Sequence, residues 1–385
     1  MRYLPITIEA RGPLAFPERK PGVQFRASLP YVPGAVLYGA LGARLGGRQA
    51  HTPEELARLF RAVRCHNAYP ALAGDPWSRP LPMTALRPKG DEQITHDALY
   101  DRVCWEQQRP PALIYAPTDA EGRPWEAVGR AFYTRDQKTH TPVFRSVQQR
   151  VLTRVAINRR RGTTADGQLF SPLVISEVME LDGELVPTRF LGSVAVPEDV
   201  PDLVGQLAAI SLLGGRQTTG SGEVSIQVGA ELPAEDHVAD LRRRIDAMSA
   251  RFRDTATLYE AMGGTPWTPG TIFTVNLLSD ALLTEQGWLP TNQLSPAMLK
   301  ERTGIDARLV RAWATTSAVG GWNVSWQRPK PTAVATQMGS LFVYEVPGRL
   351  DDAQCQRLVA LEHDGIGDRR AEGYGQVRIC DEFHL

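Results

Sequence analysis

Two glycine-rich segments, GGRQTTGSGEV at 214–224 and GIGDRRAEGYGQV at 365–377, share one pattern of residue types. Glycine permits positive φ and lets other groups approach the bare backbone, and consecutive amides in such a loop form a concave site for phosphate oxygens. Each segment also carries arginine, whose guanidinium pairs with phosphate in a bidentate manner. The pattern predicts two anion-binding loops; the alternative is that the glycines only cap helices and turn the chain. The residues expected to make the contact are Gly215, Arg216, Gly220, Gly222, Gly367, Arg369, Arg370, Gly373 and Gly375.

Positive charge is also concentrated between Lys138 and Arg161, where seven basic side chains occur and no acidic one. The whole chain has 43 basic and 43 acidic residues, so the remainder is net acidic. An arginine-rich run suits the phosphate backbone of RNA, because each neutralised phosphate releases counterions. The alternative is a solvated face of a helix or hairpin. The residues of this run expected to bind RNA are Arg145, Arg150, Arg154, Arg159, Arg160 and Arg161.

Aromatic side chains lie next to cations in GGWNVSWQRPKP at 320–331, where Trp326 is close in sequence to Arg328 and Lys330. Such side chains stack on unpaired bases, although tryptophan is at least as often part of a core. Tyr374, inside the second glycine segment, is a further stacking candidate. We therefore expect base stacking by Tyr374 or a tryptophan, beside the phosphate contacts.

The elements that must position these residues follow from hydrophobic periodicity and capping signals. In the first part of the chain we expect strands at 3–9 and 222–228 and helices at 53–64 and 199–213. In the last part we expect strands at 271–279, 340–346 and 373–380 and a helix at 351–364. A charged helical stretch at 234–262 is interpreted as a connector. Both parts then end alike, with a helix, a glycine loop and a strand.

This order of strands and helices is the split βαβ plan of a ferredoxin-like domain. We expect an α+β fold with two ferredoxin-like domains of the RNA-recognition-motif type. The expected division is a first domain at 1–230 with an irregular insertion at 66–136, a helical connector at 231–264 and a second domain at 265–385.

Composition excludes several classes of protein. The chain has 385 residues, of which 42% are hydrophobic and 22% charged, as in soluble globular proteins. Its longest apolar runs are shorter than a membrane span requires, and we expect a cytoplasmic protein.

The four cysteines form no Cys-x-x-Cys pair, so we expect no metal. The glycine loops follow helices and precede strands, the reverse of a dinucleotide-binding fingerprint, and we expect no cofactor.

Four segments resemble the CRISPR RAMP superfamily, the repeat-associated mysterious proteins. GIGDRRAEGYGQV at 365–377 is similar to its glycine-rich signature, and LPYVPGAVLYGALGARL at 29–45 looks like its proline-glycine turn before the first helix. RVAINRRRGTTADGQLF at 154–170 and WNVSWQRPKPTAVATQMGSLFVYEV at 322–346 also match. Together they most resemble the Csx-ten group, the Cas-five-like subunit of type III-D effectors.

The resemblance implies a structural subunit at the foot of a multisubunit antiviral defence complex. Such a subunit holds the repeat-derived 5′ tag of the crRNA and contacts the large polymerase-like subunit and the first backbone RAMP subunit, so that target RNA is contacted only indirectly. It is not an enzyme. The resemblance thus adds a named guide RNA and named partners to the RNA-binding loops expected from the residues.

Three alternatives come from other chemistries. A metal-independent endoribonuclease that processes guide precursor RNA needs a general base, for which the candidates are His66, His96, His140 and His363. A backbone-type subunit that cleaves target RNA would use Asp136 or Asp166 with a metal. A zinc site could draw on Cys65, His66, His96 and Cys104, although their spacing fits no compact zinc motif.

Overall fold

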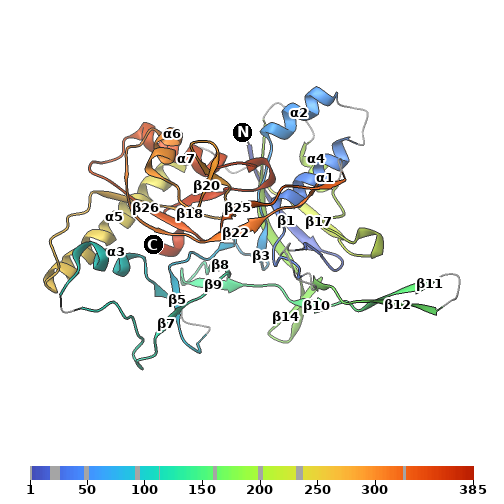
Figure 1. The fold of residues 1–385 in the computed structure, drawn as a ribbon, viewed down its shortest axis with the longest axis horizontal. Coiled ribbons are helices and arrows are strands. Elements are labelled where there is room, and N and C mark those ends of the chain that lie inside the picture. The colour runs from blue at the N-terminus through green and yellow to red at the C-terminus, as the bar shows by residue number, and fades with distance from the viewer. Residues whose placement is uncertain are drawn as a thin grey trace.

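The computed structural model describes residues 2–17, 27–46, 52–91, 96–111, 113–158, 163–197, 203–230, 237–323 and 327–385. Helices and strands are interleaved along this part of the chain, and the main sheets are antiparallel. The expected α+β class is therefore confirmed. Figure 1 shows two halves side by side, with the blue N-terminal segments on the right and the orange and red C-terminal segments on the left.

The first sheet has the strand order β17–β1–β16–β2, and β3 also pairs with β16. Strand β1 alternates as the sequence predicts, because Leu4, Ile6 and Ile8 are buried and the residues between them face the other side. The strand expected at 3–9 is confirmed, and the one expected at 222–228 begins at Val224. The bounds are β1 Arg2–Ala10, β2 Arg64–Cys65, β3 Tyr69–Ala71, β16 Arg189–Val196 and β17 Val224–Val228.

Three helices share a core with this sheet: α1 Gly34–Gly46, α2 Pro53–Ala62 and α4 Leu203–Ala208. Helix α2 is the helix expected at 53–64, and it begins at the predicted capping box of Thr52. Helix α4 is shorter than the helix expected at 199–213, of which 199–202 lies outside the described residues. After Ala208 the chain turns back on the next strand, because the Leu213 amide donates to the Gly222 carbonyl at 2.8 Å.

The second sheet has the strand order β21–β26–β18–β27. The strands expected at 271–279, 340–346 and 373–380 are present, although each is shorter than expected. When the four strands of each half are numbered in chain order, both sheets read fourth, first, third, second. The bounds are β18 Thr271–Leu277, β21 Arg308–Trp313, β26 Leu341–Val346 and β27 Val377–Ile379.

Four helices surround the second sheet: α3 Leu99–Gln108, α5 His237–Ala261, α6 Pro296–Thr303 and α7 Asp352–Asp364. Helix α7 is the helix expected at 351–364 and starts at an Asp351 capping box. Helix α5 is the expected connector, but it packs into the second core through residues such as Leu241, Met248 and Phe252. The many charged residues of α5 favoured a solvent-exposed connector in the sequence and masked its packing into the core. The position of the domain boundary stays a prediction.

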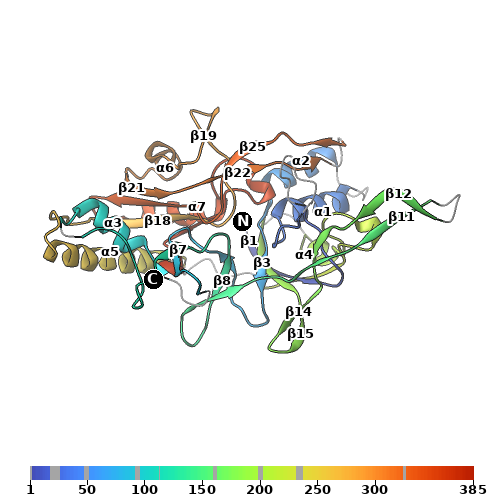
Figure 2. The same ribbon diagram turned by 60° about the horizontal axis from the view of Figure 1, so that its bottom comes forward.

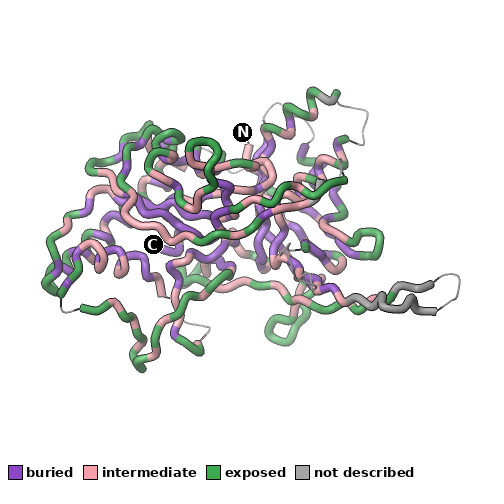
Figure 3. Tube along the Cα trace, viewed as in Figure 1, coloured by how far each residue is buried: buried purple, intermediate pink, exposed green. Residues whose placement is uncertain are grey.

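The insertion expected to be irregular, 66–136, contains β3 of the first sheet and helix α3. Tyr100 and Cys104 of α3 lie in the second core, against α5 rather than against the first half. The Tyr100 hydroxyl donates to the His384 carbonyl at 2.7 Å. The insertion therefore spans both halves, because its apolar residues complete the second core. Figure 3 shows buried residues concentrated within each half.

Short antiparallel ribbons complete the fold. The described part of the basic run, 138–158, lies on β9, β10 and β11 and not on a helix. Figures 1 and 2 show the β11–β12 ribbon projecting from the body. No helix in the described part of the chain has both the length and the apolar character needed to cross a bilayer.

The bounds of the remaining strands are β4 Arg79–Pro80, β5 Ala85–Pro88, β6 His96–Asp97, β7 Trp125–Ala127, β8 Phe132–Arg135, β9 Pro142–Arg145, β10 Gln149–Val151, β11 Arg154–Asn158, β12 Thr163–Phe170, β13 Leu173–Ile175, β14 Val178–Leu181, β15 Glu184–Pro187, β19 Leu283–Glu285, β20 Leu289–Thr291, β22 Thr316–Val319, β23 Trp322–Asn323, β24 Arg328–Pro329 and β25 Ala333–Thr336. The 3₁₀ helices are η1 Gln217–Thr219, η2 Arg370–Glu372 and η3 Glu382–His384.

Candidate nucleic-acid interface

The second glycine loop, residues 365–377, leaves the end of α7, passes through η2 and enters β27. Its glycines adopt positive φ, and they are needed because other parts of this chain lie against them. A Cβ atom on Gly375 would lie 1.8 Å from the Ile366 carbonyl oxygen, and one on Gly367 would lie 2.3 Å from the Leu282 carbonyl oxygen. The close approach that glycine permits is therefore an approach to protein backbone.

Most backbone amides of this loop are already used. The amides of Ile366, Asp368 and Gly375 donate to the carbonyls of Gly375, Leu282 and Asp280 at 2.8, 3.0 and 2.8 Å. The amides of Glu372 and Gly373 close the η2 turn. The expected nest of free consecutive amides for phosphate is therefore wrong for these positions, because hydrogen bonds inside the chain satisfy them. These amides are therefore not free to bind an anion.

The loop also joins the two halves, at the start of helix α1. A Cβ atom on Gly373 would lie 2.6 Å from the Cys65 carbonyl oxygen, and one on Gly34 would lie 1.9 Å from the same oxygen. The Asn67 side chain accepts from the Gly34 amide at 2.8 Å, and the Asn67 amide donates to the Gln376 side chain at 3.1 Å. The proline-glycine turn and the closing loop, far apart in the sequence, are thus one structural unit.

The arginine and the lysine predicted to bind RNA at this loop share one acidic side chain, and the predicted tyrosine lies against the arginine. Arg369 and Lys330 each approach a Glu372 carboxylate oxygen at 2.6 Å, and the Arg369 guanidinium lies 4.8 Å from the centre of the Tyr374 ring. Burial raises the pKa of Glu372, but the hydrogen bonds from Arg369 and Lys330 lower it more, so its pKa lies below the usual glutamate value. One carboxylate therefore faces two cations, and one face of Tyr374 is occupied.

Arg370 has a different environment. Its Nη1 atom is 3.4 Å from the Asp364 carbonyl oxygen, and no carboxylate of the described residues comes within 4 Å of its guanidinium. Burial, Arg302 and Arg64, in that order, lower the pKa of Arg370 below the usual arginine value. Arg370 thus carries a positive charge that the surrounding side chains leave uncompensated.

The first glycine loop, residues 214–224, repeats the local build of the second. Arg216 has left-handed backbone with φ of 61°, η1 follows, and Gly220 caps it with φ of 77°. In the second loop Arg369 has φ of 55°, η2 follows, and Gly373 caps it with φ of 87°. Left-handed backbone costs an ordinary L-residue about 1–2 kcal/mol, and glycine avoids that cost. Arginine is nevertheless the residue at this position in both loops.

The hydrogen bonds of the two loops also correspond. The Leu213 amide donates to the Gly222 carbonyl at 2.8 Å, as Ile366 does to Gly375. The amides of Gly215 and Gly222 donate to the carbonyls of Ala15 and Pro13 at 2.9 and 2.8 Å. The predicted repetition of one loop in the two halves is confirmed at this level of detail. The amides of Gly215 and Gly222 thus bind the first loop to residues 13–15 of the first half. The amides of Asp368 and Gly375 bind the second loop to residues 280–282 of the second half in the same way.

The arginines of the basic run are divided between acids and the first loop. Arg145 makes two 2.7 Å contacts with Asp75, and Arg150 lies 2.6 Å from Glu177. Arg154 donates to the Thr219 carbonyl, which ties the base of the β11–β12 ribbon to the first loop. Two of the expected phosphate contacts are therefore neutralised by acids that are distant in sequence. Arg159, Arg160 and Arg161 lie outside the described residues.

The described parts of the aromatic and basic segment, 320–323 and 327–331, form a ribbon near the second loop. Arg328 is exposed on β24, and Lys330 reaches Glu372. Tyr374 packs with Val319 and Ala335, from the β22–β25 part of the same ribbon. Trp326 lies outside the described residues, so base stacking by this tryptophan stays a prediction.

The structure places one of the four candidate histidines, His363, against His237, which was not a candidate. His363 lies 3.1 Å from His237, nitrogen to nitrogen, and its ring centre is 4.3 Å from that of Tyr3. His66 Nδ1 is 2.7 Å from the Ser193 hydroxyl, and burial, Arg64 and His363 lower the pKa of His66 to about 4. The other two candidates, His96 and His140, are remote: His96 faces Trp125, and His140 sits in an exposed turn. His237 was missed because no motif surrounds it.

The metal alternatives receive no support from the described residues, among which no group of three His, Cys, Asp or Glu side chains is placed to hold an ion. Cys65 and Cys104, proposed as joint zinc ligands, are buried in different cores. The Asp136 carboxylate accepts from the amides of Lys138 and Thr139 at 2.8 and 2.7 Å and serves a turn. The side chain of Asp166 lies outside the described residues.

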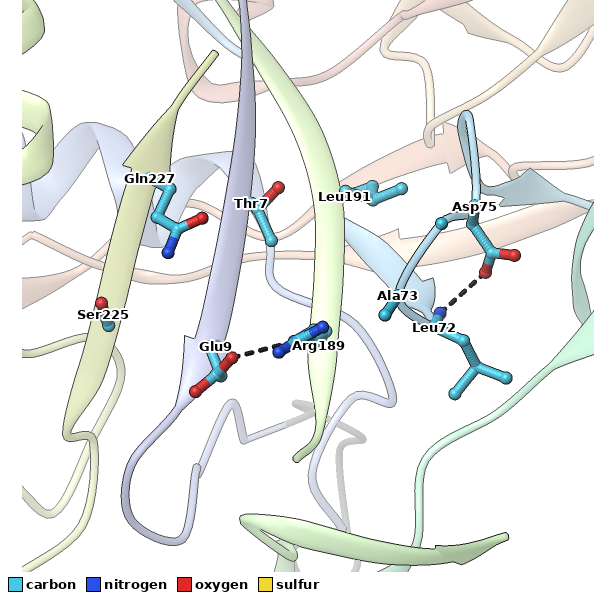
Figure 4. A pocket seen from close by; sticks show the side chains of 10 residues that line it. Thr7, Glu9, Leu72, Ala73, Asp75, Arg189, Leu191, Ser225 and Gln227 are labelled. Carbon is cyan, nitrogen blue, oxygen red and sulfur yellow. Dashed lines mark hydrogen bonds and ion pairs between the residues drawn. The ribbon is translucent and has the colours of Figure 1, made fainter. Parts of the chain in front are cut away.

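A hollow of about 250 Å³ lies on the outer face of the first sheet, and the sequence did not point to it. Figure 4 shows Thr7 and Glu9 of β1 beside Arg189 of β16 and Gln227 of β17. Glu9 and Arg189 form a 2.8 Å ion pair there. Its charged groups are thus already paired, which distinguishes this hollow from the surroundings of Arg370.

Comparisons with known proteins were made by sequence and by structure. No family and no curated protein matches the sequence. A chain in a structure described as type III-B Cmr-beta bound to cognate target RNA and AMPPnP is 11% identical with a TM-score of 0.45, covering 88% of this chain and 86% of that one. A chain in the Csm3-Csm4 subcomplex of the type III-A CRISPR-Cas interference complex is 11% identical with a TM-score of 0.38, covering 88% of this chain and 92% of that one. Similarity of this degree assigns the chain to no family.

Proposed function

We propose that this protein is a non-catalytic subunit of a type III CRISPR effector complex that binds the guide RNA. Two ferredoxin-like domains would carry the binding surface, and the shared strand order of the two sheets supports that description. The four sequence segments that resemble the RAMP superfamily support the complex, its polymerase-like large subunit and its backbone subunits as partners, and a cytoplasmic location. The finer assignment, a Csx-ten subunit that holds the 5′ tag of the crRNA, rests on the same segments.

One observation carries the RNA-binding role: the strained arginine that recurs at the same point of both loops. Arg216 and Arg369 occupy left-handed backbone where glycine would cost less. Backbone strain of this kind is kept where a side chain is needed at that place. Both arginines begin short 3₁₀ turns that follow a helix and precede an edge strand of their sheet. The repeat therefore places one arginine of each half where a chain of phosphates running across both halves would meet it. At the second loop a phosphate would share Arg369 with Glu372, which lies 2.6 Å from it.

The test uses the same strain. Replacing Arg216 or Arg369 with glycine relieves left-handed backbone, so we expect the thermal stability of each variant to be kept or raised. Affinity for a single-stranded RNA with the repeat-derived tag should nevertheless fall about tenfold, and the slope of log affinity against log salt should shrink by roughly 0.7 for each phosphate that the variant no longer neutralises. Fluorescence anisotropy at several salt concentrations measures both quantities.

A matched control is Gln286→Gly, because Gln286 also has left-handed backbone, with φ of 53°, in an exposed turn away from both loops. It should leave RNA affinity and its salt dependence unchanged. If the arginine variants bind RNA as the wild type does at every salt concentration, the arginines are structural and the proposal fails.

The endoribonuclease alternative is kept because of one contact, the approach of His363 to His237 and Tyr3 near His66. A histidine pair can move a proton to and from a 2′-hydroxyl without a metal. Incubation of pure protein with repeat RNA in EDTA separates the two functions: a defined cut that disappears in His363→Gln would replace the binding role with catalysis. A cut that appears only with added magnesium would instead favour the carboxylate alternative at Asp136 or Asp166.

A further inference from the structure

The arginines near the second glycine loop fall into two groups. In the first group a carboxylate neutralises the arginine: Arg369 pairs with Glu372 at 2.6 Å, and Arg378 pairs with Glu362 at 3.3 Å. Arg64, Arg302 and Arg370 form the other group, because no carboxylate of the described residues lies within 4 Å of any of them. We call these three residues the junction arginines.

Arg64 is held in place at the end of helix α2. Its Nη1 atom donates to the carbonyls of Arg61, Ala62 and Val63 at 2.7, 2.9 and 3.1 Å. These are among the unpaired carbonyls that a helix leaves at its C-terminus. Its Nε atom is buried and has no hydrogen-bond partner among the described residues. The hydrogen bonds from Nη1 thus fix one edge of the Arg64 guanidinium. The Nε–H group remains as a donor without an acceptor among the described residues.

Backbone packing brings Arg370 to the same place. Gly373, at the end of η2, lies against the Cys65 carbonyl, one residue after Arg64. Helix α6, which carries Arg302 in its last turn, packs on α7, and the second loop with Arg370 follows directly after α7. The first half therefore supplies Arg64, and the second half supplies the other two junction arginines.

The electrostatic effects agree with this placement. After burial, Arg302 and Arg64 are the largest causes that lower the pKa of Arg370, and the more distant Asp364 and Asp368 offset them only in part. Arg64 also lowers the pKa of His66, after burial, and opposes the rise in the pKa of Tyr38. Arg64 and Arg370 are partly buried and Arg302 is exposed. Neighbouring cations repel each other, and an anion bound between them removes that repulsion.

We propose that Arg64, Arg302 and Arg370 form a single phosphate-binding site across the junction of the two halves, occupied by neighbouring phosphates of an RNA strand. The identification of RNA as the natural ligand rests on the proposed function; the anion site itself does not. Guanidinium suits this role because its fork of donors matches phosphate oxygens. Arg64 and Arg302, which no motif marked, would join Arg370, while Arg369 stays paired with Glu372.

Inorganic pyrophosphate is the probe for the anion site, because it contains two joined phosphates and no base. At constant ionic strength, it should raise the melting temperature of the wild-type protein by a few degrees, since a ligand that binds only the folded state stabilises it. The double variant Arg302→Gln with Arg370→Gln should not show this rise. The control double variant, Arg308→Gln with Arg349→Gln, removes two exposed arginines that are paired with Glu345 and Asp246 and should keep it.

RNA binding completes the test. In Arg302→Gln with Arg370→Gln we expect a loss of affinity of at least tenfold and a salt slope smaller by roughly 1.4, about 0.7 for each phosphate on a single strand. Wild-type melting that does not respond to pyrophosphate, or responds equally in the double variant, overturns the site. RNA binding that is unchanged in the double variant overturns RNA as the ligand of this site and leaves the proposed function standing. A pyrophosphate effect without any RNA binding supports the site and refutes the proposed function.

Discussion

Lowering the pH from 7 to 5 should weaken the fold through His66. The structure holds the pKa of His66 at about 4, against an ordinary value of 6.5, because burial and the charge of Arg64 oppose its protonation. Above pH 6.5 the imidazole is neutral in the folded and unfolded chains, so its contribution to stability is complete. As the pH falls below 6.5, the unfolded chain binds a proton that the folded chain refuses, and stability decreases until the pH reaches about 4.

The size of the effect follows from these two pKa values. One pKa unit corresponds to about 1.4 kcal/mol, so the complete loss is on the order of 3 kcal/mol, of which about 2 kcal/mol is reached at pH 5. The pKa of Glu362 and Glu382 lies below the usual glutamate value, so the loss that these carboxylates cause begins at lower pH. The interval from pH 7 to 5 therefore reports mainly on histidine.

The assay is urea unfolding at pH 7 and pH 5, followed by tryptophan fluorescence, on the wild type and on His66→Gln. Glutamine can keep a hydrogen bond to Ser193, which His66 contacts at 2.7 Å, but it does not titrate. The variant should lose less free energy of unfolding between the two pH values than the wild type, by about 2 kcal/mol. His140→Gln, at an exposed histidine, should behave as the wild type does. Equal losses in the wild type and His66→Gln would refute the reasoning.

Three further outcomes are expected from single substitutions. Gly375→Ala should lower the free energy of unfolding by at least about 3 kcal/mol or prevent folding, because its Cβ atom would lie 1.8 Å from a backbone carbonyl oxygen. The control is Gly220→Ala, which has open space around it and should lower the free energy of unfolding by only about 1–2 kcal/mol in thermal unfolding. Glu362→Gln should cost about 3 kcal/mol in urea unfolding, because it leaves two arginines without their buried partner, and a loss below about 1 kcal/mol would contradict this role. Arg154→Ala should free the β11–β12 ribbon from the first loop and speed limited proteolysis there, whereas Arg150→Ala, which leaves that hydrogen bond intact, should not.

Local features of this protein could be predicted from its sequence. Alternation marked β1, the Thr52 capping box marked the start of α2, and an amphipathic pattern marked α7. The repetition of the glycine loops between a helix and a strand was also visible. These features depend on residues close together in the chain, whose backbone preferences and hydrogen bonds act over a few positions.

The partners of the charged residues could not be predicted in the same way. Arg145 and Arg150 looked like part of a free basic run, yet Asp75 and Glu177 neutralise them. Arg369 looked like a cation without a partner, yet its guanidinium is paired with Glu372 and lies over the Tyr374 ring. Ion pairs depend on which charged side chains the fold brings within a few ångströms of each other. Distances between side chains that are far apart in the chain cannot be predicted from local sequence patterns.

The sequence alone therefore determined the α+β class, the repeated loops and their arginines. Only the tertiary structure decided that the glycines make room for the protein's own backbone, that α5 and α3 belong to the second core, and that the loop carrying Arg370 packs against the backbone next to Arg64. The physical reason is the range of the interactions. Turns and caps are local, whereas core packing and electrostatics join residues that are more than a hundred positions apart.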